Sequence, residues 1–299
     1  MITSFFGNTP NFEENKIKKT EGNDNLGATP MEVSKFINKK TSYLNLFKRR
    51  RNLLPHKKGI VKRKYFRGEK FNLKEILLYN NDWDEENDVN LMKTTSIPRG
   101  IETLKYTIDS EKIILVEDSS SIYSLVHRVK NLNYDGINFH SVDEAYQYYK
   151  LIDFCGSNEN MLYSMLSKKN AQRSYVKMCL ALHNKTRADV IKWRGKEGLK
   201  LLFNLTYQKF VQNKELYEIM KADKDKLILN IFGEDNYDAC GRVQDLVPWL
   251  HEHHFHPIEI PEVMDFSDIK LFPKISTGRN LQGVIVMLVR RYLEKNIPH

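Results

Sequence analysis

Residues 139–150, with the sequence FHSVDEAYQYYK, predict the start of the helix around which the rest of the chain is organised. Ser141 followed three residues later by Glu144 is a capping-box pattern, which indicates a helix N-terminus. At about 100° per residue, three polar side chains then share one helix face: Asp143, Gln147 and Lys150. The apolar side chains take another face: Val142, Ala145, Tyr149 and Ile152. A carboxylate, an amide and an ammonium on one face predict a polar site, and the helix N-terminus favours the ionised form of the carboxylate.

The composition is typical of a globular protein. The chain has 299 residues, of which 41% are hydrophobic and 28% are charged, and this length fits two domains or one domain with a long tail. No window approaches 18 consecutive apolar residues, so we expect no membrane span. The first residues, MITSFFGNTPNFEEN, lack a basic start followed by an apolar run, so we expect no secretory signal.

The cysteine and histidine patterns predict neither a metal nor a cofactor. The three cysteines are scattered and form no CxxC pair, which favours a reducing compartment without a disulfide framework: Cys155, Cys179 and Cys240. Four histidines cluster in a short stretch but do not form an HExxH motif: His251, His253, His254 and His256. We therefore interpret the histidine cluster as a polar loop.

The positive charge is concentrated at the N-terminus. Residues 1–70 contain 17 Lys and Arg against 6 Asp and Glu, a net charge of +11, so the rest of the chain carries 9 − 11 = −2. Because this segment is also polar and lacks a sustained period, we expect a disordered basic arm. The basicity therefore gives no indication that the folded part binds nucleic acid.

Two pieces of the arm predict partners. In residues 1–7, Ile2 precedes the aromatic pair Phe5 and Phe6 by three residues, which resembles the peptide that docks on the DNA sliding clamp. The usual glutamine before the aliphatic residue is absent, and the alternative is a terminus without a function. Residues 48–67 hold ten basic residues and no acid, which predicts a nuclear import signal or, alternatively, a nucleic-acid contact or a solvated tail.

The remaining chain predicts a mainly helical α+β fold with one domain. Residues 71–110 are expected to form a linker with a short helix, and residues 111–295 to form the domain. Buried strands are predicted at 112–118 and 226–233. Helices are predicted at 159–183 (one or two), over 196–221 (one long helix) and at the C-terminus, whereas 242–277 is expected to be an irregular insertion.

Four motifs follow one another along the chain. They are the DG turn leading to VDEAYQYYK, Trp193 with Lys209-Phe210, the polar loop EDNYDACG at 234–241, and GRNLQG at 278–283 followed by Met287 and Arg290. In this order they resemble the NADAR family, over about residues 113–293. Members of this family include N-glycosidases that act on riboflavin-pathway intermediates and members that remove ADP-ribose from guanine in DNA. The resemblance therefore implies a NADAR-like domain.

The resemblance also implies roles for individual residues. Asp143 stands where the family has its catalytic Glu, and either Asp235 or Asp238 takes the role of a second carboxylate. The implied ligand-binding residues are Gln147, Lys150, Trp193, Lys209, Gly278 and Asn280. Three departures matter: Asp143 is one methylene shorter than the family Glu, Glu144 stands where the family has a His, and Cys240 replaces a Trp. A carboxylate near C1′ of a ribosyl group would stabilise an oxocarbenium-like transition state or position water.

The expected function is hydrolysis of an N-glycosidic bond in a phosphoribosyl or ADP-ribosyl compound, with ADP-ribosylated guanine in DNA as the attractive substrate for a nuclear, clamp-docked protein. The alternative is an inactive NADAR-like module that binds nucleotides or acts as a scaffold at the replication machinery. A third interpretation treats the arm as inert and the domain as a cytoplasmic metabolite hydrolase.

Overall fold

The computed structural model describes residues 94–157, 159–167, 172–233, 235–263, 266 and 268–296. The expected basic arm, with the clamp-like peptide 1–7 and the basic segment 48–67, lies outside these residues, as does the short helix expected near residue 75. Among the helices of the described ranges, none combines the length and the apolar character that crossing a membrane requires.

The α+β class with more helix than strand is confirmed. Two short parallel strands, β2 (Ile113–Val116) and β5 (Leu227–Asn230), pair with Ile113 opposite Leu227. Both lie within the strands predicted at 112–118 and 226–233. Every residue of β5 is buried, as is typical of a parallel strand that is covered on both faces.

Two further strand pairs are antiparallel. The strands β3 (Asn133–Tyr134) and β4 (Ile137–Asn138) form a hairpin around Asp135-Gly136, which have φ angles of 50° and 80°. Positive φ at both turn residues is what a two-residue type I′ hairpin turn requires. The strands β1 (Thr103–Thr107) and β6 (Pro257–Pro261) pair with each other although they lie far apart in the sequence. The expected linker 71–110 therefore contributes a strand to the folded part.

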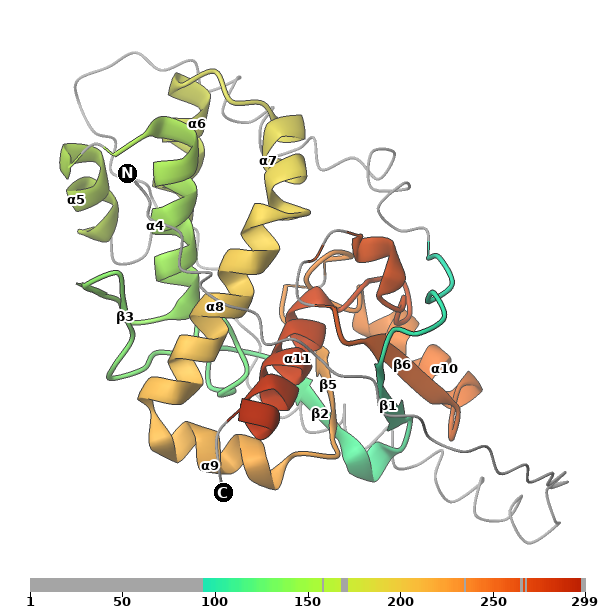
Figure 1. The fold of residues 1–299 in the computed structure, drawn as a ribbon. Coiled ribbons are helices and arrows are strands. Elements are labelled where there is room, and N and C mark those ends of the chain that lie inside the picture. The colour runs from blue at the N-terminus through green and yellow to red at the C-terminus, as the bar shows by residue number, and fades with distance from the viewer. Residues whose placement is uncertain are drawn as a thin grey trace, which may run out of the picture. The chain divides into compact units, whose positions relative to one another are not determined.

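The helices between β4 and β5 form one side of the fold in Figure 1. They are α4 (Val142–Cys155), α5 (Glu159–Leu166), α6 (Gln172–Leu182), α7 (Arg187–Arg194), α8 (Glu197–Gln212) and α9 (Lys214–Ala222). Helix α4 packs against α6 and α8, and α8 packs against the C-terminal helix α11 (Leu281–Asn296), which also covers β5. The first ten residues of α11 are all buried, so α11 is the central helix of the core.

The single long helix predicted over 196–221 is wrong, because the helix breaks at Asn213. This residue has φ −125° and ψ 87°, and it separates α8 from α9. Its buried side-chain amide donates to the carbonyls of Lys209 at 2.7 Å and Asn131 at 2.6 Å. The amide thus takes the place of a backbone donor at the helix end, a competition that Asn side chains are known for.

The irregular insertion predicted at 242–277 is also wrong in part. It contains α10 (Val243–Glu252), the strand β6 and the short 3₁₀ helix η2 (Ile269–Leu271). Another short 3₁₀ helix, η1 (Ser110–Lys112), lies directly before β2. Pro248 inside α10 and the following histidines suggested a loop, but Leu246 and Leu250 bury one face of the helix. Burial of this face outweighs the local breaker.

Candidate functional site

Helix α4 begins where the sequence predicts. The Ser141 side chain accepts a hydrogen bond from the backbone N–H of Glu144 at 3.1 Å, and Ser141 has the extended conformation of an N-cap. The carboxylate of Glu144 accepts from the backbone N–H of His140 at 2.6 Å and from Gln172 Nε2 at 2.8 Å. Both oxygens of Glu144 are therefore used to hold the helix start and its neighbour α6.

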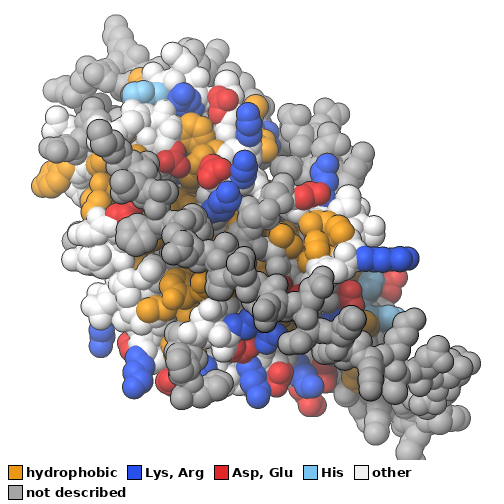
Figure 2. Space-filling view, viewed as in Figure 1, with side chains coloured by type: hydrophobic (Ala, Val, Ile, Leu, Met, Phe, Trp, Pro, Cys, Tyr) orange, Lys and Arg blue, Asp and Glu red, His pale blue; other side chains and the backbone are white. Residues whose placement is uncertain are grey.

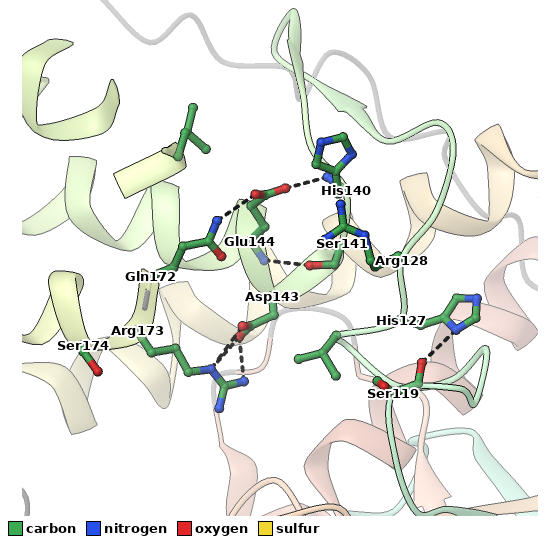
Figure 3. A pocket seen from close by; sticks show the side chains of 12 residues that line it. Ser119, His127, Arg128, His140, Ser141, Asp143, Glu144, Gln172, Arg173 and Ser174 are labelled. Atoms are coloured by element: carbon green, nitrogen blue, oxygen red, sulfur yellow. Dashed lines mark hydrogen bonds and ion pairs between the residues drawn. The ribbon is translucent and has the colours of Figure 1, made fainter. Parts of the chain in front are cut away.

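Asp143 lies beside Glu144 in the first turn, with its carboxylate directed away from the helix start (Figure 3). Gln147 Nε2 donates to Asp143 Oδ1 at 3.2 Å, which confirms that these two side chains share a helix face. Arg173 of α6 makes three contacts with the same carboxylate: its Nε lies 3.1 Å from each oxygen, and its Nη2 lies 2.7 Å from Oδ1. The Asp143 side chain is 13% exposed and that of Arg173 is 61% exposed.

Asp143 lines a cavity of about 800 Å³, a volume within the range of small-molecule sites. The wall opposite α4 and α6 comes from residues 119–128, which include His127 and Arg128 (Figure 3). The lining mixes apolar surface, to which Val126 and Leu166 belong, with polar groups of both signs: Ser119, His127, Arg128, His140, Ser141, Asp143, Glu144, Gln172, Arg173 and Ser174. Such a lining suits a ligand with hydroxyl groups and negative charge.

The loop that carries the other two candidate carboxylates lies near α7. Asp238 Oδ2 accepts from Arg194 Nη2 at 2.8 Å, and the Arg194 guanidinium stacks on the ring of Tyr237 at 4.3 Å. Asp235 Oδ1 accepts from the backbone N–H groups of Tyr237 at 2.9 Å and Asp238 at 2.6 Å. Desolvation of its carboxyl group and the neighbouring Asp238 raise the pKa of Asp235, although the residue as a whole is exposed.

Lys150 connects the two carboxylate regions electrostatically. Burial, together with the positive charges of Arg194, Lys177 and Arg173, lowers the pKa of Lys150 to about 8. Asp143 acts on the same ammonium in the opposite direction. The structure therefore brings Asp143, Lys150 and Asp238 into one charged region, although Lys150 and Asp238 are not among the residues that line the 800 Å³ cavity.

Trp193 packs inside the fold. Its ring lies 5.2 Å from Tyr146 and 5.7 Å from Phe154, measured between centroids, and its Nε1 donates to Asp153 Oδ2 at 2.8 Å. The side chain is buried and makes no part of the cavity wall. These contacts hold α7 against α4. The role of Trp193 in stacking on a ligand stays a prediction.

Lys209 is fully buried in α8. Its ammonium donates to the carbonyl of Ser124 at 2.9 Å, and the next carbonyl, that of Leu125, accepts from the backbone N–H of Asp143 at 2.9 Å. Lys209 thus anchors the segment that forms one cavity wall and contacts the first turn of α4. Burial lowers the pKa of Lys209 to about 7.

Replacing Lys209 by Met is expected to change how stability depends on pH. Because the pKa of Lys209 in the folded protein, about 7, lies below its ordinary value of 10.5, the unfolded chain binds more protons between these values. In the wild type this lysine therefore lowers stability below pH 7, and the loss is relieved as pH rises, by up to about 1.4 kcal/mol per pH unit. Denaturant unfolding at pH 6.5, 8 and 9.5 measures the difference. Lys209→Met should lack this rise, the exposed Lys192→Met should keep it, and parallel profiles for wild type and Lys209→Met would contradict the argument.

Gly278 and Asn280 pack the loop 235–241 against the start of α11. A Cβ on Gly278 would lie 2.7 Å from the Cys240 carbonyl carbon and from the Gly241 nitrogen. The Asn280 side chain accepts from Asn230 N at 2.7 Å and donates to the Ile228 carbonyl at 2.8 Å, with no exposed surface. Gly278 thus allows close packing of the backbone, and the amide of Asn280 joins the backbone of β5 to the start of α11.

Three arginines of this region carry no signal in the sequence that marks them as site residues. Arg128, Arg173 and Arg194 come from a loop, from the first turn of α6 and from the last turn of α7. Each is one of 47 Lys and Arg residues, without a motif that distinguishes it. Figure 2 shows basic and acidic side chains side by side on the viewed face.

Within the described residues, no three His, Cys, Asp or Glu side chains gather into a group that could hold a metal ion. The sequence matches no model of a known protein family, and no curated protein matches it.

Proposed function

We propose that this protein is a NADAR-type hydrolase that cleaves an N-glycosidic bond in a phosphoribosyl or ADP-ribosyl compound. The observation that carries the proposal is the position of the Asp143 carboxylate, which opens on a cavity of about 800 Å³ whose walls also contain Arg128 and Arg173. A carboxylate and guanidinium groups in one cavity match a substrate that develops positive charge at C1′ and carries negative charge on phosphate.

In this proposal the Asp143 carboxylate stabilises the oxocarbenium-like transition state, or accepts a proton from the attacking water. Gln147 holds one carboxylate oxygen and thereby orients the group. The arginines bind phosphate through paired N–H donors. Lys150 and Asp238, in the adjoining charged region, are candidates for contacts to a longer ligand that extends beyond the cavity.

A second candidate is a binding module without turnover. It is favoured by the three contacts that Arg173 makes with Asp143, because a carboxylate occupied by a guanidinium is not free for chemistry. Such a module would recognise nucleotides through the same cavity. If the clamp-like peptide 1–7 and the basic segment 48–67 act as proposed, either protein would work in the nucleus next to replicating DNA.

The test is release of ADP-ribose from DNA that carries ADP-ribosylated guanine. The full-length protein is expected to release free ADP-ribose and restore unmodified guanine, which chromatography with mass spectrometry detects. A 5-phosphoribosyl N-glycoside tested in parallel distinguishes a DNA repair substrate from a small metabolite. Binding of ADP-ribose in calorimetry with no cleavage of either compound would contradict the hydrolase and favour the binding module.

A further inference from the structure

The two arginines that line the cavity differ in what they contact. Arg128 is exposed, and no hydrogen bond or ion pair of Arg128 is found within the part of the chain that the structure describes. Arg173 instead pairs with Asp143: its Nε lies 3.1 Å from both carboxylate oxygens, and its Nη2 lies 2.7 Å from Oδ1. One cation of the cavity is thus open to a ligand, and the other covers the candidate catalytic carboxylate (Figure 3).

The contact between Arg173 and Asp143 is of a kind that a ligand can displace. The Arg173 side chain is 61% exposed, so solvent partly screens its attraction for the carboxylate. Asp143 is 13% exposed and keeps the hydrogen bond from Gln147 when the arginine leaves. A phosphate offers the guanidinium the same paired acceptor geometry as a carboxylate, with more negative charge.

The donors of the lining also fit an anion. Asp143 is paired with Arg173, whereas Glu144 accepts only from neutral donors, the His140 N–H and Gln172, and keeps its negative charge. The guanidinium of Arg128 and the imidazole of His140 remain to donate to phosphate oxygens, since His127 gives its Nδ1–H to the Ser119 carbonyl at 3.0 Å. The ligand class that fits is a phosphate or diphosphate ester.

We propose that Arg173 is a phosphate-responsive latch: a phosphate group of the ligand draws the guanidinium away from Asp143, and this exchange frees the carboxylate. Arg128 binds the same phosphate or its neighbour from the opposite wall. The role of the freed carboxylate rests on the proposed function, but the exchange itself needs only anion binding. As a result, a neutral nucleoside leaves Asp143 covered, and only a phosphorylated compound uncovers it. Arg173 thereby determines specificity for phosphorylated substrates.

A double-mutant cycle with inorganic pyrophosphate as the probe tests the latch without any turnover. Calorimetry on the full chain compares the wild type with Asp143→Asn, Arg173→Gln and the double variant. Asp143→Asn is expected to bind pyrophosphate about fivefold to tenfold more tightly, because the competing carboxylate no longer holds Arg173. Arg173→Gln should bind about tenfold more weakly, and adding Asp143→Asn to it should change little. Any binding by the basic segment 48–67 is common to all four proteins and cancels in the cycle.

Arg242→Gln is the matched control. Arg242 also pairs with an aspartate, Asp245, through Nε at 2.9 Å, and its side chain is 70% exposed, but it does not line the cavity. This variant should bind pyrophosphate like the wild type. If Asp143→Asn raises the affinity for pyrophosphate equally with and without Arg173, the cause is a general loss of negative charge and the latch is overturned. The latch is also overturned if Asp143→Asn does not raise the affinity. If the protein cleaves an ADP-ribosyl substrate but the double-mutant cycle contradicts the latch, only the latch is rejected. If the cycle gives the expected affinities but neither substrate is cleaved, the latch stands and the hydrolase is rejected.

Discussion

Asp143→Asn is expected to lower the rate of N-glycosidic cleavage by about 10²–10⁴-fold, the usual size of a lost catalytic acid–base group or charge stabiliser. Asparagine is close in shape to aspartate and can still accept from Gln147, so the variant removes the charge and largely keeps the geometry. The loss should appear in the single-turnover rate at saturating substrate, because the charge acts on the transition state. Release of ADP-ribose from modified DNA under enzyme excess measures it.

Two further carboxylates make the result specific. Glu144→Gln neutralises the next residue of the same helix, whose oxygens accept from the His140 N–H and from Gln172. It is expected to lose at most about threefold, the effect of a weakened helix start on positioning. Glu218→Gln removes an exposed carboxylate on α9 and should leave the rate unchanged. Equal rates for the wild type and Asp143→Asn would reject Asp143 as the catalytic group, and a larger loss in Glu144→Gln would transfer that role to Glu144.

Gly278→Ala is expected to destabilise the fold by about 3 kcal/mol, near the upper end for an added methyl group in a closed site. The new Cβ would press on the backbone of residues 239–241, which cannot rotate away as a flexible side chain would. That backbone also accepts a hydrogen bond from the residue directly before α11, since Asn280 N bonds the Ala239 carbonyl at 3.0 Å. The strain would therefore reach the central helix. Thermal unfolding should show Tm lower by about 10 °C for a folded part of this size.

Gly195→Ala is the matched control for the added methyl group. Gly195 ends α7 with φ −71°, a conformation that alanine adopts freely. Its Cβ would lie 3.5 Å from the Ile191 carbonyl oxygen, an ordinary contact. The stability change should stay within about 0.5 kcal/mol. If Gly278→Ala unfolds like the wild type but no longer binds ADP-ribose, the close packing does not explain this glycine, and direct contact with the ligand does.

The features that the sequence predicts well are local. The start of α4 at Ser141, the turn at Asp135-Gly136 and the pairing of Gln147 with Asp143 depend on residues at most four positions apart. Helix geometry and turn conformations fix such relations without reference to the rest of the chain. The strands β2 and β5 were also predictable, since continuous runs of β-branched and apolar residues are typical of buried parallel strands.

Other features needed contacts between distant segments. Asn213 ends α8 because its amide reaches Asn131, 82 residues earlier, and the local helical period gives no sign of this. Likewise, α10 forms despite Pro248 because the core covers one of its faces. Propensity is a weak signal, and tertiary packing overrides it at these points.

By itself, the sequence determined that a carboxylate, an amide and an ammonium share one face of a capped helix, because the helical repeat places residues 143, 147 and 150 there. The tertiary structure alone decided what these groups meet. It brought Arg173 onto Asp143 from 30 residues away, placed Arg128 on the facing wall, and enclosed Lys209 and Asn280 in the core. The physical reason is that burial and charge pairing depend on which distant segments pack together, and the spacing of residues along the chain does not contain that information.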